Sequence, residues 1–290
     1  MDSRPRRRPP AASAPGAWPL RRPPLQSPWP AAPQYHLPRT RSTVEDARRL
    51  VRLAPYDGAL ITADYQTRGR GRTAARRWVS EPRRNLLFNL LLSADSVGAQ
   101  PQRLPLLTGL AVARAVEAEG GPACRVKWPN DVVAGGAKIA GCLCERTGGW
   151  YSVGVGVTCN QRRGLPPGAP GELPASSIRL QSGRWVRRWV LLAAILAALH
   201  RLLAEPEWAP AVDRKLLLRG EWVQLDGAAR GLPREVRVIG ITAAGGLTVE
   251  DAAGLRHTCF AGSIRVPANF PRATGRGAGQ PQTVASRPGC

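Results

Sequence analysis

Lysine is scarce in this sequence. Of its 42 Lys and Arg residues only three are lysine, namely Lys127, Lys138 and Lys215. A compact ammonium and a broad, planar guanidinium are not equivalent at a binding site. A position that keeps lysine in a chain that otherwise uses arginine therefore indicates a site that needs a point charge.

Long apolar runs and metal-binding motifs are also absent. The longest apolar run inside a helical pattern, residues 189–199, is well short of the roughly 20 residues that a membrane span needs. The six cysteines show no Cys-x-x-Cys spacing and follow no secretory signal, so we assign no metal ligands and expect a cytoplasmic protein with reduced thiols. No Gly-x-Ser-x-Gly elbow occurs, which argues against a serine hydrolase.

The formal charge of +22 suggests nucleic-acid binding until its distribution is considered. Residues 1–41 contribute +7 and residues 268–290 contribute +3, which leaves +12 spread over residues 42–267. A nucleic-acid-binding protein remains an alternative interpretation, because Gly/Arg repeats are common in RNA-binding segments. Only about 40 Pro-rich residues precede the globular pattern, too few for a winged helix, so we expect no sequence-specific DNA binding.

Composition divides the chain into four parts. Residues 1–36 are rich in Pro, Arg and Ala and are predicted to form a disordered extension, and residues 268–290 a disordered tail. Residues 37–212 are predicted to form the main domain. Residues 213–267 contain short β-like runs separated by turn residues, at 222–225, 235–241, 246–249, 256–261 and 263–266, as in a small barrel.

Hydrophobic periodicity predicts the elements of the main domain. Helices are expected from Thr43 through residue 51, where Thr43 and Asp46 form a capping-box-like start, and at residues 104–119 and 185–204. Strands are expected at residues 59–65, 85–92, 125–128, 138–145 and 150–159, the last two joined as a hairpin. A Gly/Arg loop is expected at residues 67–77.

Residues 127–145, KWPNDVVAGGAKIAGCLCE, contain two of the three lysines. The pattern predicts a strand, a Pro-Asn-Asp turn, a short strand, a Gly-Gly turn and a strand that opens with Lys138. Alternation along that last strand places Lys138 on one face with Ala140, Cys142 and Cys144. A cation flanked by small side chains suits an anionic ligand; the alternative is a hairpin whose lysine points to solvent.

Two glycine motifs accompany this lysine. Gly154 and Gly156 lie two apart on one strand and leave a face without side chains, which fits either a ligand or close packing against a helix. Residues 66–72, QTRGRGR, place three arginines at alternate positions near Trp78. Glycine supplies freedom and arginine supplies forked donors for phosphate or carboxylate.

Together these motifs resemble the biotin–protein ligase family. That family carries, in this order, a Ser-Thr helix start, a Gly-Arg-Gly-Arg loop, a Lys-Trp-Pro-Asn-Asp turn followed by a lysine, and a Gly-x-Gly strand. The same order occurs here. The resemblance implies an α+β fold: a mixed, largely antiparallel sheet with helices, as in class II synthetases and biotin ligases, in a catalytic domain at residues 37–212, and an SH3-like barrel at residues 213–267. Lipoate ligases share the overall fold, but the Lys-Trp-Pro-Asn-Asp block favours biotin.

The resemblance also implies the site residues. Lys138 and Arg72 would be catalytic. Biotin or its adenylate would contact Ser42, Thr43, Gln66, Gly69, Arg70, Gly71, Arg72, Lys138, Gly141, Gly154 and Gly156. Trp78, Asn130, Asp131, Thr158 and Asn160 would form the nucleotide side. Val44, the spacing of Trp78 and Thr158 depart from the family pattern, and Asn160 is the candidate for the amide that the family commonly has at position 158.

Biotin ligases join biotin to the α-phosphate of ATP, releasing pyrophosphate, and then pass the acyl group to a lysine of a carrier. The resemblance therefore implies biotin and ATP with Mg²⁺ as ligands and a biotin carboxyl carrier protein or domain as partner, with no membrane involved. Arg70 and Arg72, placed between glycines, are predicted to form a lid that orders over the reactive adenylate.

Overall fold

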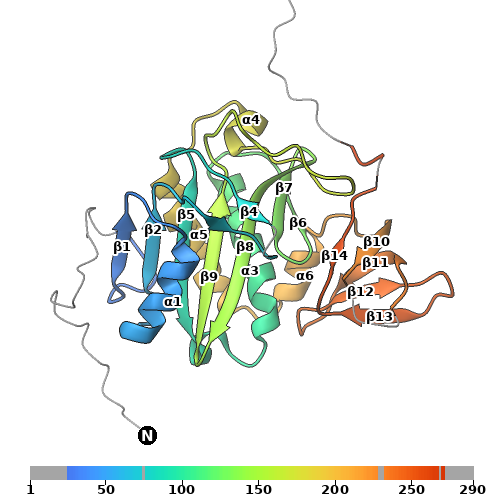
Figure 1. The fold of residues 1–290 in the computed structure, drawn as a ribbon. Helices are drawn as coiled ribbons and strands as arrows, with labels where there is room; N and C mark the ends of the chain where they lie inside the picture. Colours follow the sequence, from blue (N-terminus) through green and yellow to red (C-terminus); the bar gives the residue numbers. More distant parts are fainter. Residues whose placement is uncertain (1–24, 74–75, 228–231, 268, 272–290) are drawn as a thin grey trace, which may run out of the picture.

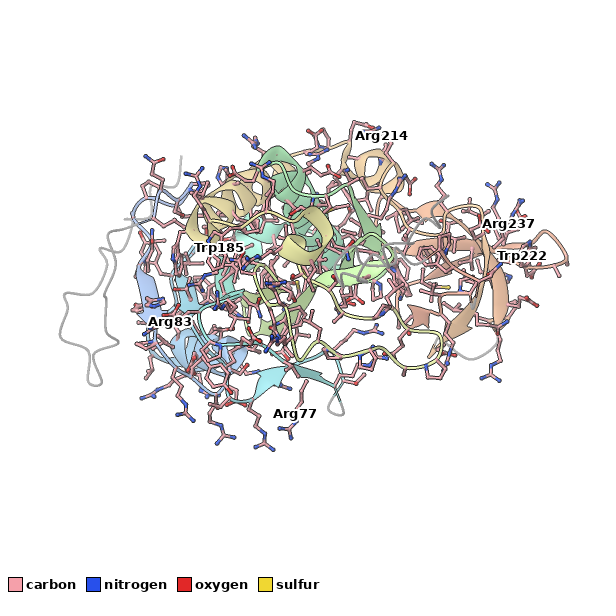
Figure 2. The ribbon with its side chains drawn as sticks, turned by 90° about the horizontal axis from the view of Figure 1, so that it is seen from above. Arg77, Arg83, Trp185, Arg214, Trp222 and Arg237 are labelled. Carbon is pink, nitrogen blue, oxygen red and sulfur yellow. The ribbon has the colours of Figure 1, made fainter. Side chains whose placement is uncertain are left out.

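The computed structural model describes residues 25–73, 76–227, 232–267 and 269–271. The predictions of disorder for residues 1–24 and for most of the C-terminal tail lie outside the described residues. Arginine side chains project from several sides of the molecule, among them Arg77, Arg83, Arg214 and Arg237 (Figure 2). Basic side chains thus lie on several sides of the molecule and are not gathered on one face in this view.

A seven-stranded sheet forms the centre of the larger domain (Figure 1), in the order β1-β2-β5-β9-β8-β7-β6. Only β1 and β2 are parallel to each other; the other neighbours are antiparallel. The predicted mixed, largely antiparallel sheet is therefore confirmed. The strands are β1 (Gln34–Leu37), β2 (Leu60–Ala63), β5 (Leu86–Ser93), β6 (Cys124–Lys127), β7 (Asp131–Ala134), β8 (Ala137–Thr147) and β9 (Trp150–Val157).

The edge strand β1 corrects the predicted start of the domain. Residues 34–36 were assigned to a disordered extension, but Gln34 pairs with Leu60 of β2. The side chain of Gln34 also exchanges two hydrogen bonds with the backbone of Leu25, at 2.9 and 2.8 Å. The prediction was wrong because backbone pairing and side-chain bonds order this Pro-rich segment, and neither leaves an apolar pattern in the sequence.

Helices cover both faces of the sheet (Figure 1). The helix α1 (Thr43–Leu53) lies on one face, and the longer α3 (Leu104–Ala118) and α5 (Arg188–Leu203) pack together on the other. Shorter elements are α2 (Ala94–Val97), η1 (Pro101–Arg103), α4 (Ile178–Ser182) and α6 (Trp208–Asp213). In the part of the chain that the structure describes, no helix combines the length and the apolar character that crossing a bilayer requires.

The helix α1 begins at Thr43 as predicted, but its capping residue differs by one position from the predicted capping-box-like start. Ser42, and not Thr43, is the N-cap, and its hydroxyl accepts a hydrogen bond from the Val44 N–H at 3.3 Å. Asp46 does not close a capping box; its carboxylate accepts from the Thr40 hydroxyl at 2.6 Å. Because Ser42 caps the helix, the hydroxyl of Thr43 is free to bond to the side chain of Gln66.

The smaller domain is an antiparallel sheet in the order β13-β12-β11-β10-β14, which is consistent with the predicted SH3-like barrel. Its strands are β10 (Trp222–Asp226), β11 (Glu235–Ile241), β12 (Leu247–Glu250), β13 (Arg256–Cys259) and β14 (Ser263–Ile264). The segment before it is tied to the large sheet, because Val126 of β6 exchanges backbone hydrogen bonds with Lys215 and Leu217, both at 2.8 Å.

Part of the Gly/Arg loop forms regular structure. Its β3 (Gly69–Arg70) pairs with β4 (Arg77–Trp78) as a two-stranded antiparallel ribbon. Gly69 is opposite Trp78, and a Cβ at Gly69 would lie 2.5 Å from the Trp78 carbonyl oxygen. Glycine at this position is therefore required by the close approach of the two strands.

Candidate functional site

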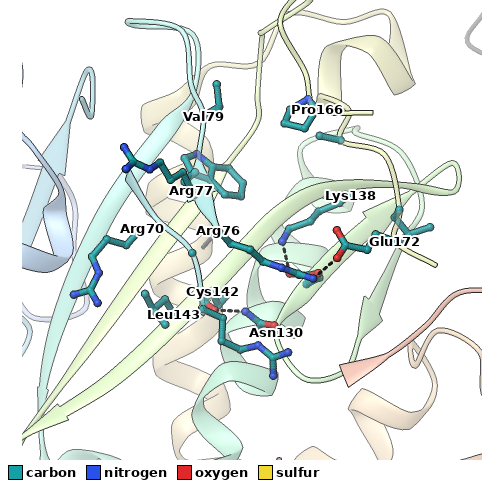
Figure 3. Close-up of a pocket in the computed structure, with 18 of the residues that line it drawn as sticks. Arg70, Arg76, Arg77, Val79, Asn130, Lys138, Cys142, Leu143, Pro166 and Glu172 are labelled. Carbon is teal, nitrogen blue, oxygen red and sulfur yellow. Dashed lines mark hydrogen bonds and ion pairs between the residues drawn. The ribbon is translucent and has the colours of Figure 1, made fainter. Parts of the chain in front are cut away.

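A cavity of about 360 Å³ lies between the two domains (Figure 3). Its walls come from the start of α1, the β3–β4 ribbon, the β7–β8 hairpin, β9, the loop at residues 162–177 and the barrel. The predicted site residues that line it are Ser42, Thr43, Gln66, Arg70, Gly71, Arg72, Trp78, Asn130, Asp131, Lys138, Gly141, Gly154, Gly156 and Thr158. The fold thus brings together motifs that are up to 116 residues apart in the sequence.

The polar end of α1 faces this cavity. The side-chain oxygen of Gln66 accepts hydrogen bonds from the N–H of Thr43 at 2.8 Å and from its hydroxyl at 3.0 Å. Gln66 thereby satisfies one of the N–H groups that a helix start leaves without a partner. Ser42 and Thr43 are buried, so the helix start places fixed polar groups beside the cavity.

The two glycines of β9 allow close approach of side chains. A Cβ at Gly156 would lie 2.4 Å from Cε2 of Trp78, and a Cβ at Gly154 would lie 2.8 Å from Cγ2 of Val44 on α1. Gly154 therefore packs against a helix, which was one of the two alternatives, while both glycines also line the cavity. The glycine face makes room for the indole of Trp78 beside the ligand space.

Lys138 faces the cavity, but not with the neighbours that alternation predicted. The pairing of β7 and β8 shifts by one residue next to Lys138, so that Val132 pairs with Ala140 and Val133 with Lys138. This bulge reverses the faces. Lys138 now lies beside Gly141, whose added Cβ would be 3.2 Å from the lysine Nζ. The prediction of a shared face was wrong: Ala140, Cys142 and Cys144 lie on the other side of β8, with Ala140 and Cys142 buried in the hydrophobic core of α3 and α5.

Lys138 is also not a bare cation. Its Nζ lies 2.6 Å from the carboxylate of Asp131, the residue that opens β7. It lies 5.9 Å from the ring centroid of Trp78 as well, within the range of a cation–π contact. The turn between β6 and β7 is held by Asn130, whose side chain donates to the Cys142 carbonyl of β8 at 2.7 Å. An anionic ligand at Lys138 would have to compete with Asp131.

Lys127, the first residue of the motif, is a site residue that sequence reasoning did not assign. It lines the cavity and only 8% of it is exposed. Burial lowers the pKa of this lysine; Asp131 raises it, and the cations Lys138, Arg72 and Arg76 lower it further. Its place among the rare lysines was the signal that could have identified it. A buried cation among cations favours a strongly anionic ligand.

The carboxylates that line the cavity are each paired with a cation. Besides Asp131 with Lys138, Glu172 pairs with Arg76, and Asp226 pairs with Arg265 in the barrel. Sequence reasoning assigned none of the last four residues to the site. The cationic lining residues outnumber these three carboxylates; they are Arg70, Arg72, Arg76, Arg77, Lys127, Lys138 and Arg265.

The two arginines predicted to form a lid are held at the ribbon. Arg72 donates to the Gly262 carbonyl of the barrel at 2.6 Å, and Arg70 lies 3.8 Å from the carboxylate of Glu145. Glu145 also accepts two hydrogen bonds from Arg48 of α1, both at 2.8 Å. The ribbon therefore bridges the barrel and the large domain across the cavity. Closure over a ligand remains a prediction.

Two predicted residues do not reach the cavity. Gly69 serves the β3–β4 pairing, as described above. Asn160 is buried, and its amide bonds to the backbone of Val186: it accepts from the N–H at 2.8 Å and donates to the carbonyl at 3.0 Å. The structure therefore does not bring Asn160 to the cavity, because β9 ends at Val157 and strand alternation no longer applies beyond it.

The loop at residues 162–177 is a wall of the site that composition alone could not place. Its backbone bonds to the start of β8, where the Lys138 N–H donates to the Pro174 carbonyl and the Ser176 N–H donates to the Lys138 carbonyl, both at 2.8 Å. These bonds position Glu172 and Leu173 at the cavity. The Gly/Pro-rich sequence predicted a loop but not its docking.

A metal site is not evident in the described residues, which contain no cluster of three or more His, Cys, Asp or Glu suited to a metal ion. The thiolate forms of Cys142 and Cys144 are disfavoured: burial raises the pKa of Cys142 well above its usual value and that of Cys144 to about 12. Thiolate is the form that binds metals and attacks electrophiles.

Comparisons with known proteins agree with this geometry. Residues 37–161 match the Biotin/lipoate A/B protein ligase family. The biotin–[acetyl-CoA-carboxylase] ligase of Paracoccus denitrificans is 34% identical over 178 residues, which cover 58% of this chain and 72% of that protein. The bifunctional ligase/repressor BirA of Bacillus spizizenii is 31% identical over 165 residues, or 55% of this chain. The chain matches only about half (50%) of the length of that relative.

A solved structure extends the likeness to both domains. The biotin protein ligase from Aquifex aeolicus, in complex with biotin and ATP, superposes with a TM-score of 0.68 at 27% sequence identity. The match covers 81% of this chain and 99% of that one. On the Paracoccus relative, the family match and this fold, the chain belongs to the biotin protein ligase family.

Proposed function

We propose that this chain is an ATP-dependent ligase that activates biotin as biotinyl-5'-AMP and transfers the biotinyl group to a lysine of a biotin carboxyl carrier protein or domain. The observation that carries the proposal is one cavity that joins a polar helix start and a glycine-lined strand to a cluster of cations. A neutral ring system with an anionic tail fits the first part, and a triphosphate fits the second.

The first step joins two anions. An oxygen of the biotin carboxylate attacks the α-phosphorus of ATP, and pyrophosphate leaves with the electron pair of the broken P–O bond. Lys127 and Lys138 face the same cavity and would offset this repulsion. At an effective dielectric of about 20, one cation about 4 Å from one anion contributes about 4 kcal/mol, and each 1.4 kcal/mol is about tenfold in rate. Lys138 lowers the barrier to the extent that it binds the transition state more tightly than the substrates.

The second step needs an open path to the adenylate. The carrier lysine attacks the acyl carbon as a free amine, AMP leaves with the electron pair, and the amine loses a proton. The adenylate is a mixed anhydride that water would hydrolyse, so it must stay covered until the carrier arrives. Arg70 and Arg72 remain our lid residues, and the bond from Arg72 to Gly262 supports a role of the barrel in closing it.

Magnesium enters this proposal with ATP. The carboxylates that line the cavity are already paired with Lys138, Arg76 and Arg265, so they do not form a free oxygen cage for a resident ion. Mg²⁺ commonly binds through substrate phosphates and retains several waters, with one or two carboxylates at most. MgATP is therefore the substrate form, and no residue here is assigned to hold the metal by itself.

The deciding experiment mixes the full chain with MgATP, biotin and a biotin-acceptor domain, and measures biotin on the acceptor. Transfer is expected for the wild type and a loss of at least about 100-fold in rate for Lys138→Ala, whose removal also leaves Asp131 without its ion pair. Lys215→Ala is the matched control, because Lys215 pairs with Glu117 away from the cavity. Absence of transfer by the wild type would refute the proposal.

Two further arms separate the alternatives. Lipoate in place of biotin tests for a lipoate ligase, and preferential transfer of lipoate would replace our assignment. Salt-sensitive retention on DNA at physiological ionic strength would revive the nucleic-acid alternative. For the lid, Arg72→Gly is expected to release adenylate and label proteins other than the carrier; an active variant that stays specific would disprove that role.

A further inference from the structure

The pair formed by Arg76 and Glu172 differs from the other ion pairs of the cavity. Asp131 and Lys138 belong to one hairpin, and Asp226 and Arg265 belong to the barrel. Arg76 precedes β4 of the ribbon, whereas Glu172 lies in the loop at residues 162–177. Figure 3 shows the two side chains meeting from these separate segments. This pair alone among the three joins two different walls.

The position of Glu172 does not depend on Arg76. On one side of Glu172, the Gly171 carbonyl accepts from the Val266 N–H at 2.9 Å; on the other, the Lys138 N–H donates to the Pro174 carbonyl at 2.8 Å. Within the loop, the Glu172 N–H donates to the Ala169 carbonyl at 2.8 Å. The loop is therefore fixed by backbone bonds, and the carboxylate can be removed without removing what holds the loop.

Arg76 lies among cations. It lowers the pKa of both Arg72 and Lys127, after the larger effect of burial on each. Glu172 is thus the counterion of Arg76, which belongs to a group of cations formed by Arg72, Arg76, Lys127 and Lys138. A polyphosphate would bring several negative charges to the same place, and phosphate oxygens accept the same forked guanidinium donors as a carboxylate.

We propose that Glu172 is a positioning residue that holds Arg76 in the ligand-free cavity in the place of a phosphate, and that Arg76 exchanges Glu172 for the β- and γ-phosphates of ATP. The proposal rests on the proposed function for the identity of the polyanion. Replacing Glu172 by a phosphate costs little here, because the side chains of Arg76 and Glu172 are 51% and 40% exposed. Partly exposed ion pairs of this kind shift an equilibrium by no more than about fivefold. Glu172 therefore weakens the binding of ATP and of pyrophosphate by up to about fivefold.

Binding of inorganic pyrophosphate and of ATP to the full chain, measured by calorimetry without biotin, tests the exchange. Glu172→Gln is expected to bind both about two- to fivefold more tightly than the wild type. Arg76→Gln is expected to bind them more weakly, and in that background Glu172→Gln should have little further effect. Glu172→Asp, which keeps the charge, should stay near the wild type. Glu250→Gln is the matched control, because Glu250 pairs with Arg237 on the barrel.

A purely structural role for Glu172 predicts the opposite sign, since loosening the loop would weaken pyrophosphate binding. Equal or weaker binding by Glu172→Gln therefore overturns the proposal. So does equal tightening in the Arg76→Gln background, or equal tightening by Glu250→Gln, which would indicate a general charge effect. In biotin transfer, Glu172→Gln should lower KM for ATP and strengthen inhibition by pyrophosphate. Wild-type transfer in that assay tests the proposed function separately from the exchange.

Discussion

Gly156→Ala offers a direct test of how the site is packed. A Cβ at this position would lie 2.4, 2.7 and 2.8 Å from three atoms of the Trp78 ring system. Ordinary contacts of a Cβ with carbon begin near 3.4 Å, so the ring must move by roughly 1 Å or the strand must shift. Inserting a methyl group into such a tightly packed place costs about 1–3 kcal/mol. This corresponds to a loss of about 5- to 150-fold in the folded-to-unfolded ratio.

Urea unfolding followed by tryptophan fluorescence measures this cost. Gly156→Ala should lower the free energy of unfolding by about 1–3 kcal/mol and raise KM for ATP, because the displaced indole enters the ligand space. Gly149→Ala is the control, since a Cβ there meets no atom within 4 Å. In a Trp78→Ala background, which removes the clash, Gly156→Ala should cost at least about 0.5 kcal/mol less than in the wild type.

Two results would refute this reasoning. One is a Gly156→Ala protein within about 0.5 kcal/mol of the wild type with unchanged KM values, because contacts of 2.4 Å cannot then be present. The other is an equal cost with and without Trp78, which would place the strain in the β9 backbone rather than against the indole. Either outcome would remove Trp78 from the ligand-facing wall.

Three further predictions concern residues outside the reacting centre. Burial raises the pKa of Glu117, but Lys215 and other groups lower it by more, so its contribution to stability is present above the ordinary glutamate pKa and is lost as the pH falls below it. The stability advantage of the wild type over Glu117→Gln in urea should therefore shrink as the pH is lowered through that range. Asn160→Ala should lower the free energy of unfolding by about 1–3 kcal/mol in the same assay, because the N–H and the carbonyl of Val186 both lose their partner. The folded variant should keep the wild-type KM for ATP, because Asn160 does not line the cavity. Cys124, Cys144 and Cys159, whose pKa values burial raises to about 12, should resist iodoacetamide at pH 8 in the folded protein and react in urea, as peptide mapping would show.

Much of the fold and the site could be predicted from local patterns. The strands of the barrel and the helices α3 and α5 follow apolar periodicity, and the structure places them where that periodicity indicated. The order of the four motifs was enough to name the family and to gather Lys138, Arg72 and the β9 glycines at one cavity. Each element and each motif was predictable because it depends on residues close together in the sequence, whereas their meeting at one cavity was implied by the family resemblance.

Other features could not be predicted, because they depend on pairing between distant segments. The strand β1 is ordered by Leu60 and its neighbours on β2, and a Pro-rich composition gives no sign of that. Arg76 and Glu172 are 96 positions apart, and neither belongs to a motif. The same holds for the contact of Arg72 with Gly262, which is 190 positions away.

The sequence by itself determined which chemical groups this protein has for its site: two rare lysines, a Gly/Arg segment and a strand with two glycines. The tertiary structure alone decided how these groups face one another. One extra residue in β8 turned Lys138 away from Ala140 and Cys142 and toward Asp131, since a strand exposes alternate residues and a bulge reverses them. The cavity has more cations than carboxylates, and each of its three carboxylates is paired with one of those cations. Such pairing is expected where folding brings charged groups together and partly removes them from water.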